Sequence, residues 1–283
     1  SLRFEVMHPG PLFVRVAQIG DLDVSEMSAS TYMNLVSRGD DRYVALPVFL
    51  SRNFRHSYIF VSRDSGIQEP EDLRGKRIAI SGPGSTSHVV SLLSLQALNL
   101  DPAQARIAFL TIPGTEMNRR LALETSGVDA TTLRGAVGDI YGAKGYTVLY
   151  NFKTAGMTLP QNTFVTTRRI ATSKPRVVEG YLKAMVEAIS IILDPAHKEL
   201  VVRLLASNLR LSNPADAEEA YHAVTQSYER SPHVSLEGMR RLHKLLVQIN
   251  PKTAGVRVEG VIDNSFMNKL ESSGYIQSLY GRN

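Results

Sequence analysis

A stretch of small and hydroxyl-bearing residues, SGPGSTSH from Ser81 to His88, has the composition of a turn that holds a small anion. Glycines let backbone N–H groups approach a ligand, and the N-terminus of a following helix favours negative charge. We therefore predict ligand contacts from Gly84, Ser85, Thr86 and His88. The alternative is a plain strand-to-helix turn in which Ser85 or Thr86 only caps the helix. The spacing matches neither a dinucleotide-binding fingerprint nor a P-loop.

A second hydroxyl-rich turn, MSAST from Met27 to Thr31, has an equivalent place between an apolar strand and a helix. Its hydroxyl groups can cap the helix or bind a ligand. We predict that Met27, Ser28, Ser30 and Thr31 line the same site as the first turn. Simple capping is again the alternative.

Four charged or titratable residues near the ends of predicted strands could complete the site. An arginine can hold a carboxylate or sulfonate through two parallel hydrogen bonds, so Arg55 and Arg134 are predicted anion contacts. His56 lies beside Arg55, and His8 follows the first strand of the chain. Each of these side chains could instead be a solvated surface group or form a structural ion pair.

The sequence contains no arrangement of residues that identifies a catalytic centre. It has no cysteine, which excludes disulfides, thiolate nucleophiles and cysteine-ligated zinc. It also lacks a GxSxG nucleophile elbow and a kinase signature. His8, His56 and His88 could converge with Glu26 as metal ligands or as an acid/base set, but their spacing matches no metal site. We therefore predict no catalytic residue, no metal and no cofactor.

The charge and hydropathy of the chain restrict the partners it can have. Its 32 Lys and Arg residues against 27 Asp and Glu residues give a net charge of +5, but the basic residues occur singly or in pairs. Nucleic-acid-binding proteins usually carry a basic stripe or a recognisable module, so we expect no nucleic-acid partner. No apolar run approaches the roughly 20 residues needed to cross a membrane. The chain begins at Ser1 without a methionine and shows no signal peptide, which leaves its compartment open.

The order of the expected elements predicts an α/β protein with a parallel sheet. Short apolar strands alternate with turns and amphipathic helices. The predicted strands are Leu2–Met7, Leu22–Met27, Tyr43–Leu50, Ser57–Ser62, Lys76–Ser81, Arg106–Ile112, Val128–Leu133 and Thr147–Phe152. The predicted helices among them are Pro11–Ile19, Thr31–Ser37, Glu69–Leu73, Ser85–Leu98, Thr115–Thr125 and Gly138–Lys144.

The last part of the chain has a different pattern, and the length of 283 residues suggests two lobes. If a helical tail packs on the first lobe, the chain crosses between the lobes twice. We place these crossings at Ser57–Ser62 and Thr163–Thr167 and predict that they run side by side. Thr163–Ala171 is predicted to be extended, and the helices expected after it are Pro175–Leu193, Pro195–Ser207, Pro214–Tyr228, Leu236–Ile249 and Asn264–Gly274.

Two segments carry a resemblance to a known family. EPEDLRGKRIAISGPGSTSH, which begins at Glu69, and GVDATTL, which begins at Gly127, resemble segments of the solute-binding proteins of ABC transporters of the nitrate, sulfonate, taurine and thiamine-precursor type. The resemblance covers most of the chain up to about Leu205. It implies a two-lobed, type II periplasmic-binding-protein-like α/β fold with two crossing strands and a helical C-terminal tail. The first lobe would consist of residues 1–60 plus 167–283, and the second of residues 61–166.

The resemblance implies a receptor that captures a small, anionic organic molecule, such as a sulfonate or a carboxylate, in the cleft between the lobes. Hinge closure would bury the molecule. The partner would be the membrane permease of an ABC importer, and the place would be the periplasm or another exported compartment. We expect a monomer. The family pattern begins one strand earlier than this chain, which leaves one wall of the site unassigned.

A second resemblance concerns the segment from Asp23 to Ile67. SEMSASTY, from Ser25 to Tyr32, and FRHS, which begins at Phe54, are similar to stretches of the 4,5-dihydroxyphthalate decarboxylases, which are enzymes on the same fold. This resemblance implies an alternative function as a cytoplasmic decarboxylase of an aromatic acid, with Arg55 and His56 placing the carboxylates. The turn that begins at Ser81 matches the transport pattern better. We therefore expect binding without turnover.

Overall fold

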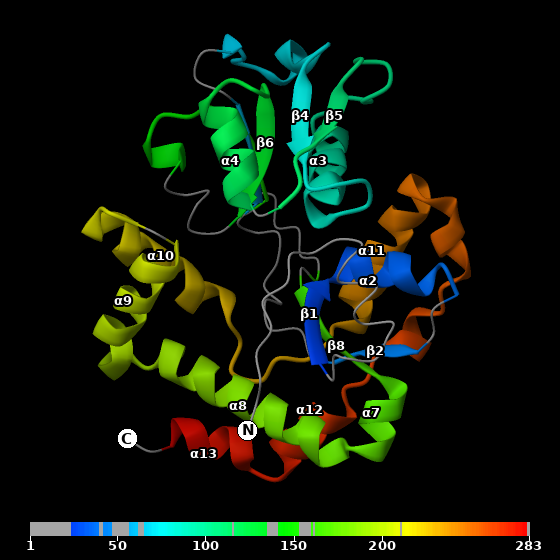
Figure 1. Cartoon of the computed structure of the whole chain (residues 1–283), viewed down its shortest axis with the longest axis vertical. Coiled ribbons are helices and arrows are strands. Elements are labelled where there is room, and N and C mark those ends of the chain that lie inside the picture. Colours follow the sequence, from blue (N-terminus) through cyan, green and yellow to red (C-terminus); the bar gives the residue numbers. More distant parts are fainter. Residues whose placement is uncertain are drawn as a thin grey trace.

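The computed structural model of the chain describes residues 24–39, 42–46, 57–61, 65–114, 116–134, 141–152, 160, 162–209 and 211–281. These residues form two β-sheets, which lie one above the other in Figure 1, and helices pack around each sheet. The predicted strand Leu2–Met7 and helix Pro11–Ile19 lie outside the described residues.

The lower sheet in Figure 1 has three described strands in the order β1-β8-β2. They are β1 (Val24–Ser28), β8 (Asn162–Thr167) and β2 (Tyr43–Ala45). Both pairs are antiparallel, with Ser28 opposite Asn162 and Ala45 opposite Val165. The central strand therefore comes from a part of the chain more than a hundred residues away from its two neighbours.

The upper sheet has five strands in the order β5-β4-β6-β3-β7. Strand β4 pairs in parallel with β5 and β6, as the sequence predicts, because the helices that connect them return the chain to the same end of the sheet. The prediction of a parallel sheet is wrong for β3, which pairs antiparallel with β6 and β7, and for the described strands of the lower sheet, which are antiparallel. The strands are β3 (Ser57–Val61), β4 (Arg77–Ile80), β5 (Ala108–Thr111), β6 (Ala130–Arg134) and β7 (Val148–Asn151).

The predicted pairing of the two crossing segments is wrong. Strand β3 has β6 and β7 as its neighbours in the upper sheet, whereas β8 has β1 and β2 in the lower one. A strand has only two hydrogen-bonding edges, and in β3 and β8 both edges face strands of their own sheet. The chain therefore changes sheets before β3 begins and before β8 begins.

Serine, threonine and asparagine caps begin several of the helices. Ser28 caps α2 (Ala29–Val36), Ser85 caps α3 (Thr86–Ala97) and Thr167 caps α7 (Arg168–Ser173). The cap at Thr167 corrects the expectation that the chain stays extended to Ala171. The other helices are α4 (Glu116–Glu124), α8 (Pro175–Leu193), α9 (Lys198–Leu209), α10 (Pro214–Ser227), α11 (Leu236–Ile249), α12 (Ser265–Ser272) and α13 (Tyr275–Tyr280), with 3-10 turns at Pro70–Leu73, Pro195–His197, Pro251–Gly255 and Val258–Val261.

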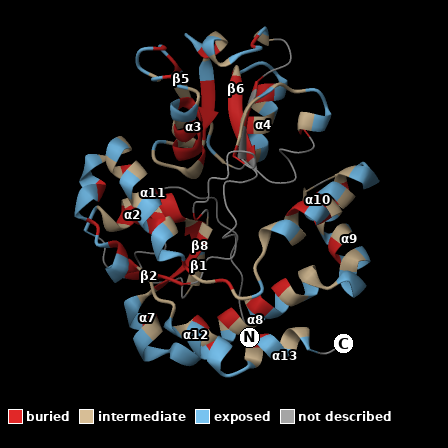
Figure 2. Cartoon of the chain, turned by 180° about the vertical axis from the view of Figure 1, so that it is seen from behind, coloured by how far each residue is buried: buried red, intermediate tan, exposed pale blue. Residues whose placement is uncertain are grey.

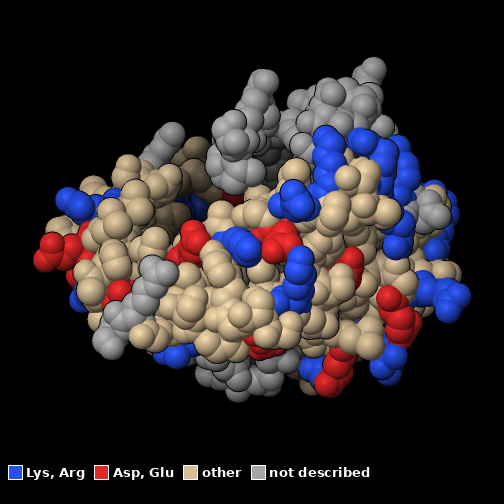
Figure 3. Space-filling model, turned by 90° about the horizontal axis from the view of Figure 1, so that it is seen from below, with Lys and Arg blue, Asp and Glu red and all other residues tan. Residues whose placement is uncertain are grey.

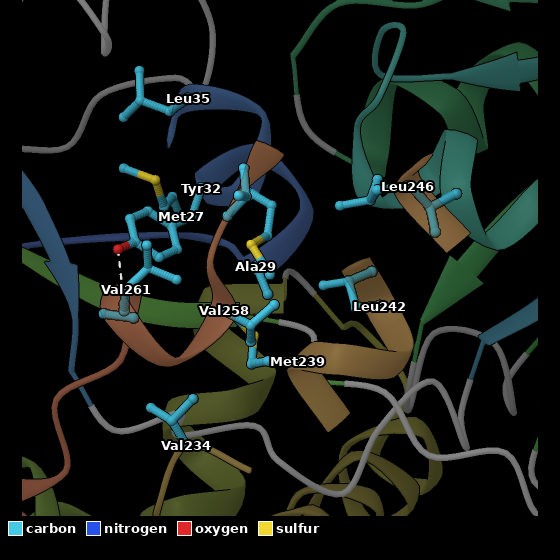
Figure 4. Close-up of a cluster of buried hydrophobic side chains, with 14 of the residues drawn as sticks. Met27, Ala29, Tyr32, Leu35, Val234, Met239, Leu242, Leu246, Val258 and Val261 are labelled. Atoms are coloured by element: carbon cyan, nitrogen blue, oxygen red, sulfur yellow. Dashed lines mark hydrogen bonds between the residues drawn. The ribbon is translucent and has the colours of Figure 1, made fainter. Parts of the chain in front are cut away.

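The helical tail packs on the lower sheet, as expected from the apolar faces of its helices. One apolar cluster joins α2 to α11, and Figure 4 shows Met239, Leu242 and Leu246 of α11 around it. Within it, the Tyr32 hydroxyl donates to the carbonyl of Val261 over 2.8 Å. Helices α8 and α12 bury a second cluster that includes Phe164 of β8. The tail is therefore part of the first lobe's core.

The hairpin of α9 and α10 also reaches the upper lobe, which the sequence did not predict. Leu211, between the two helices, packs against the cluster that contains Ala79 and Tyr141. Lys144 and Asp216 form an ion pair of 3.5 Å. Figure 2 shows much of the outer surface of this hairpin exposed. The hairpin thus connects the tail to the second lobe.

The charges on the face formed by α8, α12 and α13 are mixed. Figure 3 shows acidic and basic side chains beside one another there. Glu179, for example, lies 3.2 Å from Lys183 and 2.6 Å from Lys269. No helix within the described ranges is long and apolar enough to cross a membrane.

Candidate functional site

The turn between β4 and α3 is built from serine hydroxyls. The Ser85 hydroxyl accepts a hydrogen bond from the backbone N–H of His88 over 3.3 Å, which caps α3. The Ser87 hydroxyl accepts from the backbone N–H of Ser81 over 2.8 Å, which ties the end of β4 to the first turn of the helix. Of the two caps predicted for this helix, Ser85 is the one that forms.

A buried arginine supports this turn from behind. Arg119 of α4 is 5% exposed, and its Nη1 donates to Ser81 Oγ over 2.5 Å. Its Nη2 donates to the carbonyl of Thr132 in β6 over 3.5 Å and lies 3.8 Å from Glu116 Oε2. The guanidinium therefore lies at the carboxyl ends of β4 and β6, where ligands bind in open α/β sheets.

Arg119 is not among the predicted site residues, although the sequence contains a signal for it. Residues four apart share one face of a helix. Arg119 is four residues before Leu123, which is the apolar residue that α4 buries in the upper core. Reading the helix by this period places Arg119 on the buried face.

His88 contributes a donor rather than a charge. Its Nδ1 accepts from the backbone N–H of Gly84 over 2.9 Å. An accepting Nδ1 carries no proton, so Nε2 carries the proton of the neutral ring. Burial lowers the pKa of the imidazole below its usual value. The ring also packs edge-on against Phe109, with 4.8 Å between the ring centroids.

The turn between β1 and α2 also has a network of hydroxyls, but it contains no cation. Ser28 Oγ accepts from the backbone N–H of Thr31 over 3.1 Å and donates to Thr31 Oγ1 over 2.7 Å. Ser30 Oγ lies 3.1 Å from Ser28 Oγ and is 2% exposed. Met27 is 7% exposed and packs in the apolar cluster. These groups mainly satisfy one another.

One asparagine links the two turns. Asn34 of α2 donates through Nδ2 to the carbonyl of Gly84 over 3.3 Å, and Asn250 donates to Asn34 Oδ1 over 3.0 Å. Gly84 has a positive φ of 72°, and a Cβ at this position would lie 2.8 Å from Asn34 Nδ2. Glycine is therefore needed at residue 84 for both its conformation and its neighbour.

Strand β1 also carries a carboxylate, that of Glu26. Glu26 Oε1 accepts from Asn162 Nδ2 over 2.5 Å. Burial, and then the negative charge of Glu26, raise the pKa of the Tyr181 and Tyr228 phenols. The phenols therefore stay protonated and able to donate hydrogen bonds.

The structure brings some of the predicted residues together. Gly84, Ser85 and His88 share one turn with Thr86, the first residue of α3, and Ser28, Ser30 and Thr31 share the other. His8, Arg55 and His56 lie outside the described residues, and Arg134 is described only as the last residue of β6.

Two surface depressions and the acidic and histidine side chains offer no other site. Each depression has a volume of about 390 Å³, and neither is lined by a predicted ligand residue. No three His, Cys, Asp or Glu side chains come together as metal ligands in the part of the chain that the structure describes.

Comparisons with known proteins show the family and the fold. The family described as ABC transporter, phosphonate, periplasmic substrate-binding protein matches residues 12–204. The solved structure of the alkanesulfonate-binding protein SsuA from Xanthomonas axonopodis pv. citri, bound to MOPS, superposes with a TM-score of 0.72 at 18% identity. The match covers 90% of this chain and 85% of that one. It confirms the predicted periplasmic-binding-protein-like fold.

Two curated proteins are similar to part of the chain. A 4,5-dihydroxyphthalate decarboxylase from Comamonas testosteroni is 41% identical over 86 residues, which are 30% of this chain and 26% of that enzyme. A second one, from Pseudomonas putida, is 38% identical over 93 residues, which are 33% of this chain and 36% of that enzyme. The chain thus matches about a third or less of the length of these relatives.

Proposed function

The chain belongs to the family of periplasmic substrate-binding proteins of phosphonate-type ABC transporters, and from this we propose that it captures a small organic anion in a cleft between its two lobes. The ligand carries at least one carboxylate, sulfonate or phosphonate group. Gly84, Ser85, Thr86 and His88 bind it from the second lobe.

The contact between Asn34 and Gly84 is the observation that carries this proposal. It places the second-lobe turn against the helix that begins at the first-lobe turn. Backbone N–H groups and hydroxyls gather on the second-lobe side and can donate to an oxyanion. The buried Arg119 guanidinium supports them from behind. On the first-lobe side, Ser28, Ser30 and Thr31 complete the proposed site.

We propose that the lobes close on the ligand by a hinge between the two sheets. Residues 1–60 and 167–283 form most of the first lobe, and residues 61–166 form most of the second. In the structure, β3 lies in the upper sheet and β8 in the lower. Arg55, His56, Arg134 and His8 remain proposed contacts of the ligand.

The partner of the closed form would be the membrane permease of an importer, with the chain acting as a monomer in the periplasm. Calorimetry with MOPS, methylphosphonate and 4,5-dihydroxyphthalate tests the binding. Small-angle X-ray scattering with the anion that binds best tests closure, which should decrease the radius of gyration. Absence of binding by all three anions would contradict the proposal.

A second candidate function is the decarboxylation of an aromatic acid, and the similarity to the two decarboxylases favours it. The reaction breaks the bond between ring carbon and carboxylate, releases carbon dioxide and leaves an electron pair that must take up a proton. The enzyme therefore needs a proton donor near that carbon. His8, His56 and His88 are the candidate donors, and Arg55 and His56 would place the carboxylates. Burial lowers the pKa of His88.

Incubation of the protein with 4,5-dihydroxyphthalate, with and without divalent metal ions, separates the two functions. We expect binding and no carbon dioxide above background. Release that disappears in the variant His56→Ala, and persists in the surface variant His222→Ala, would establish the enzyme instead.

A further inference from the structure

We propose that Arg119 is a positioning residue of the anion site, which acts on the ligand through the Ser81 hydroxyl. This inference rests on the proposed binding function and adds a residue to it. Arg119 is buried, so it cannot bind a ligand in the cleft directly. Its Nη1 is 2.5 Å from Ser81 Oγ, and Ser81 is partly exposed at the end of β4.

The hydrogen bonds around Ser81 fix the direction of its proton. A guanidinium only donates, so Ser81 Oγ accepts from Arg119. The Ser87 hydroxyl also donates to Ser81 Oγ over 3.3 Å. With both lone pairs occupied, Ser81 keeps only its own proton for a further partner.

The other hydroxyl groups of the turn donate in the direction of Ser81. Ser87 gives its single proton to Ser81, so the 3.0 Å contact between Ser85 and Ser87 requires Ser85 to donate. Ser85 Oγ accepts from the backbone N–H of His88. Every hydroxyl in this row therefore donates toward Ser81, and the row ends in one donor that is polarised by a cation.

The polarised Ser81 hydroxyl favours one kind of ligand oxygen. An oxygen that only accepts, as in a carboxylate, sulfonate or phosphonate, is the best match for it, and the bond is charge-assisted. Arg119 thus favours an anion over an uncharged ester of the same shape.

Calorimetry with two anions, methylphosphonate and 4,5-dihydroxyphthalate, each beside its uncharged dimethyl ester, tests the proposal on the full chain. Arg119→Met should weaken the binding of the anions by about tenfold to a hundredfold and change the binding of the esters little. Arg119→Lys keeps the positive charge and should lose less affinity for the anions than Arg119→Met. Ser81→Ala keeps the guanidinium but removes the donor, and it should lose about as much affinity for the anions as Arg119→Met.

Arg74→Met is the matched control, because it removes an exposed arginine from the same lobe. It should leave the affinities unchanged. Thermal unfolding identifies variants that do not fold. If Arg119→Met does not fold, the affinities of Ser81→Ala decide the test. Equal losses for anions and esters would mean that Arg119 is only structural. If Arg119→Met and Ser81→Ala bind the anions as tightly as wild type, the role of Arg119 is wrong and the proposed function stands. If wild type binds none of the anions, the proposed function is wrong as well.

Discussion

The two serine-capped turns have the same local plan but different surroundings. In both, a serine ends the approach to a helix and accepts the N–H of the residue three positions later. The apolar cluster around Tyr32 packs behind the first-lobe turn and also contains Val89, Val90 and Leu93 of α3. Behind the second turn lies, in addition, the guanidinium of Arg119. Both turns therefore cap a helix with the same hydroxyl chemistry, and the second has a cationic support in addition.

The difference teaches that a serine-rich turn alone does not make an anion site. Ser28 accepts from the Thr31 N–H and donates to Thr31 Oγ1, so the row of donors in the first turn ends at the Thr31 hydroxyl, with no cation among the described partners of the turn. In the second turn the row of donors ends at Ser81, next to a buried charge. What lies behind the turn decides what the turn can bind.

The largest effect is expected where the two turns meet. Gly84→Ala forces a side chain into a left-handed conformation and displaces Asn34 from its hydrogen bond. We expect a loss of about 2–3 kcal/mol in the free energy of unfolding, measured with urea. Gly75→Ala is the control, because Gly75 has a φ of 74° and no atom within 4 Å of an added Cβ. Equal losses in the two variants would mean that the contact with Asn34 contributes nothing.

The caps allow a sharper comparison. Ser28→Ala and Ser85→Ala each remove one N-cap, so each should cost about 1 kcal/mol of stability. Only Ser85→Ala also interrupts the row that leads to Ser81. We expect calorimetry with methylphosphonate to show weaker binding for Ser85→Ala than for Ser28→Ala, after both unfolding curves have been measured. Equal affinities would remove the distinction between the turns.

The pattern of the sequence was sufficient to predict most strands, the helical tail and the position of both turns. It could not predict how β3 and β8 pair, because strand pairing depends on segments that are far apart in the chain. Arg119 was missed because a pair of arginines in a polar helix has the composition of a solvated surface. Only the position of Arg119 relative to Leu123 distinguishes it from Arg120.

The smallest effect concerns His88, which has no counterpart in the first-lobe turn. Burial lowers its pKa in the folded protein, so the unfolded chain takes up a proton first as the pH falls. The unfolded state then binds more protons, and stability decreases as the pH drops below about 6.5, the usual value for histidine. In His88→Gln this part of the pH dependence of the unfolding midpoint should disappear. An unchanged pH profile would mean that His88 is not the group responsible.

Hydrogen exchange with and without a saturating anion tests the central claim most directly, because it reports on the backbone N–H groups of both turns at once. MOPS, methylphosphonate and 4,5-dihydroxyphthalate are the probes. If the chain captures an organic anion between its lobes, exchange should slow at residues 82–88 and at residues 29–31 together. Exchange that is unchanged at both turns with all three anions, or slowed only on the face formed by α8, α12 and α13, would contradict the account.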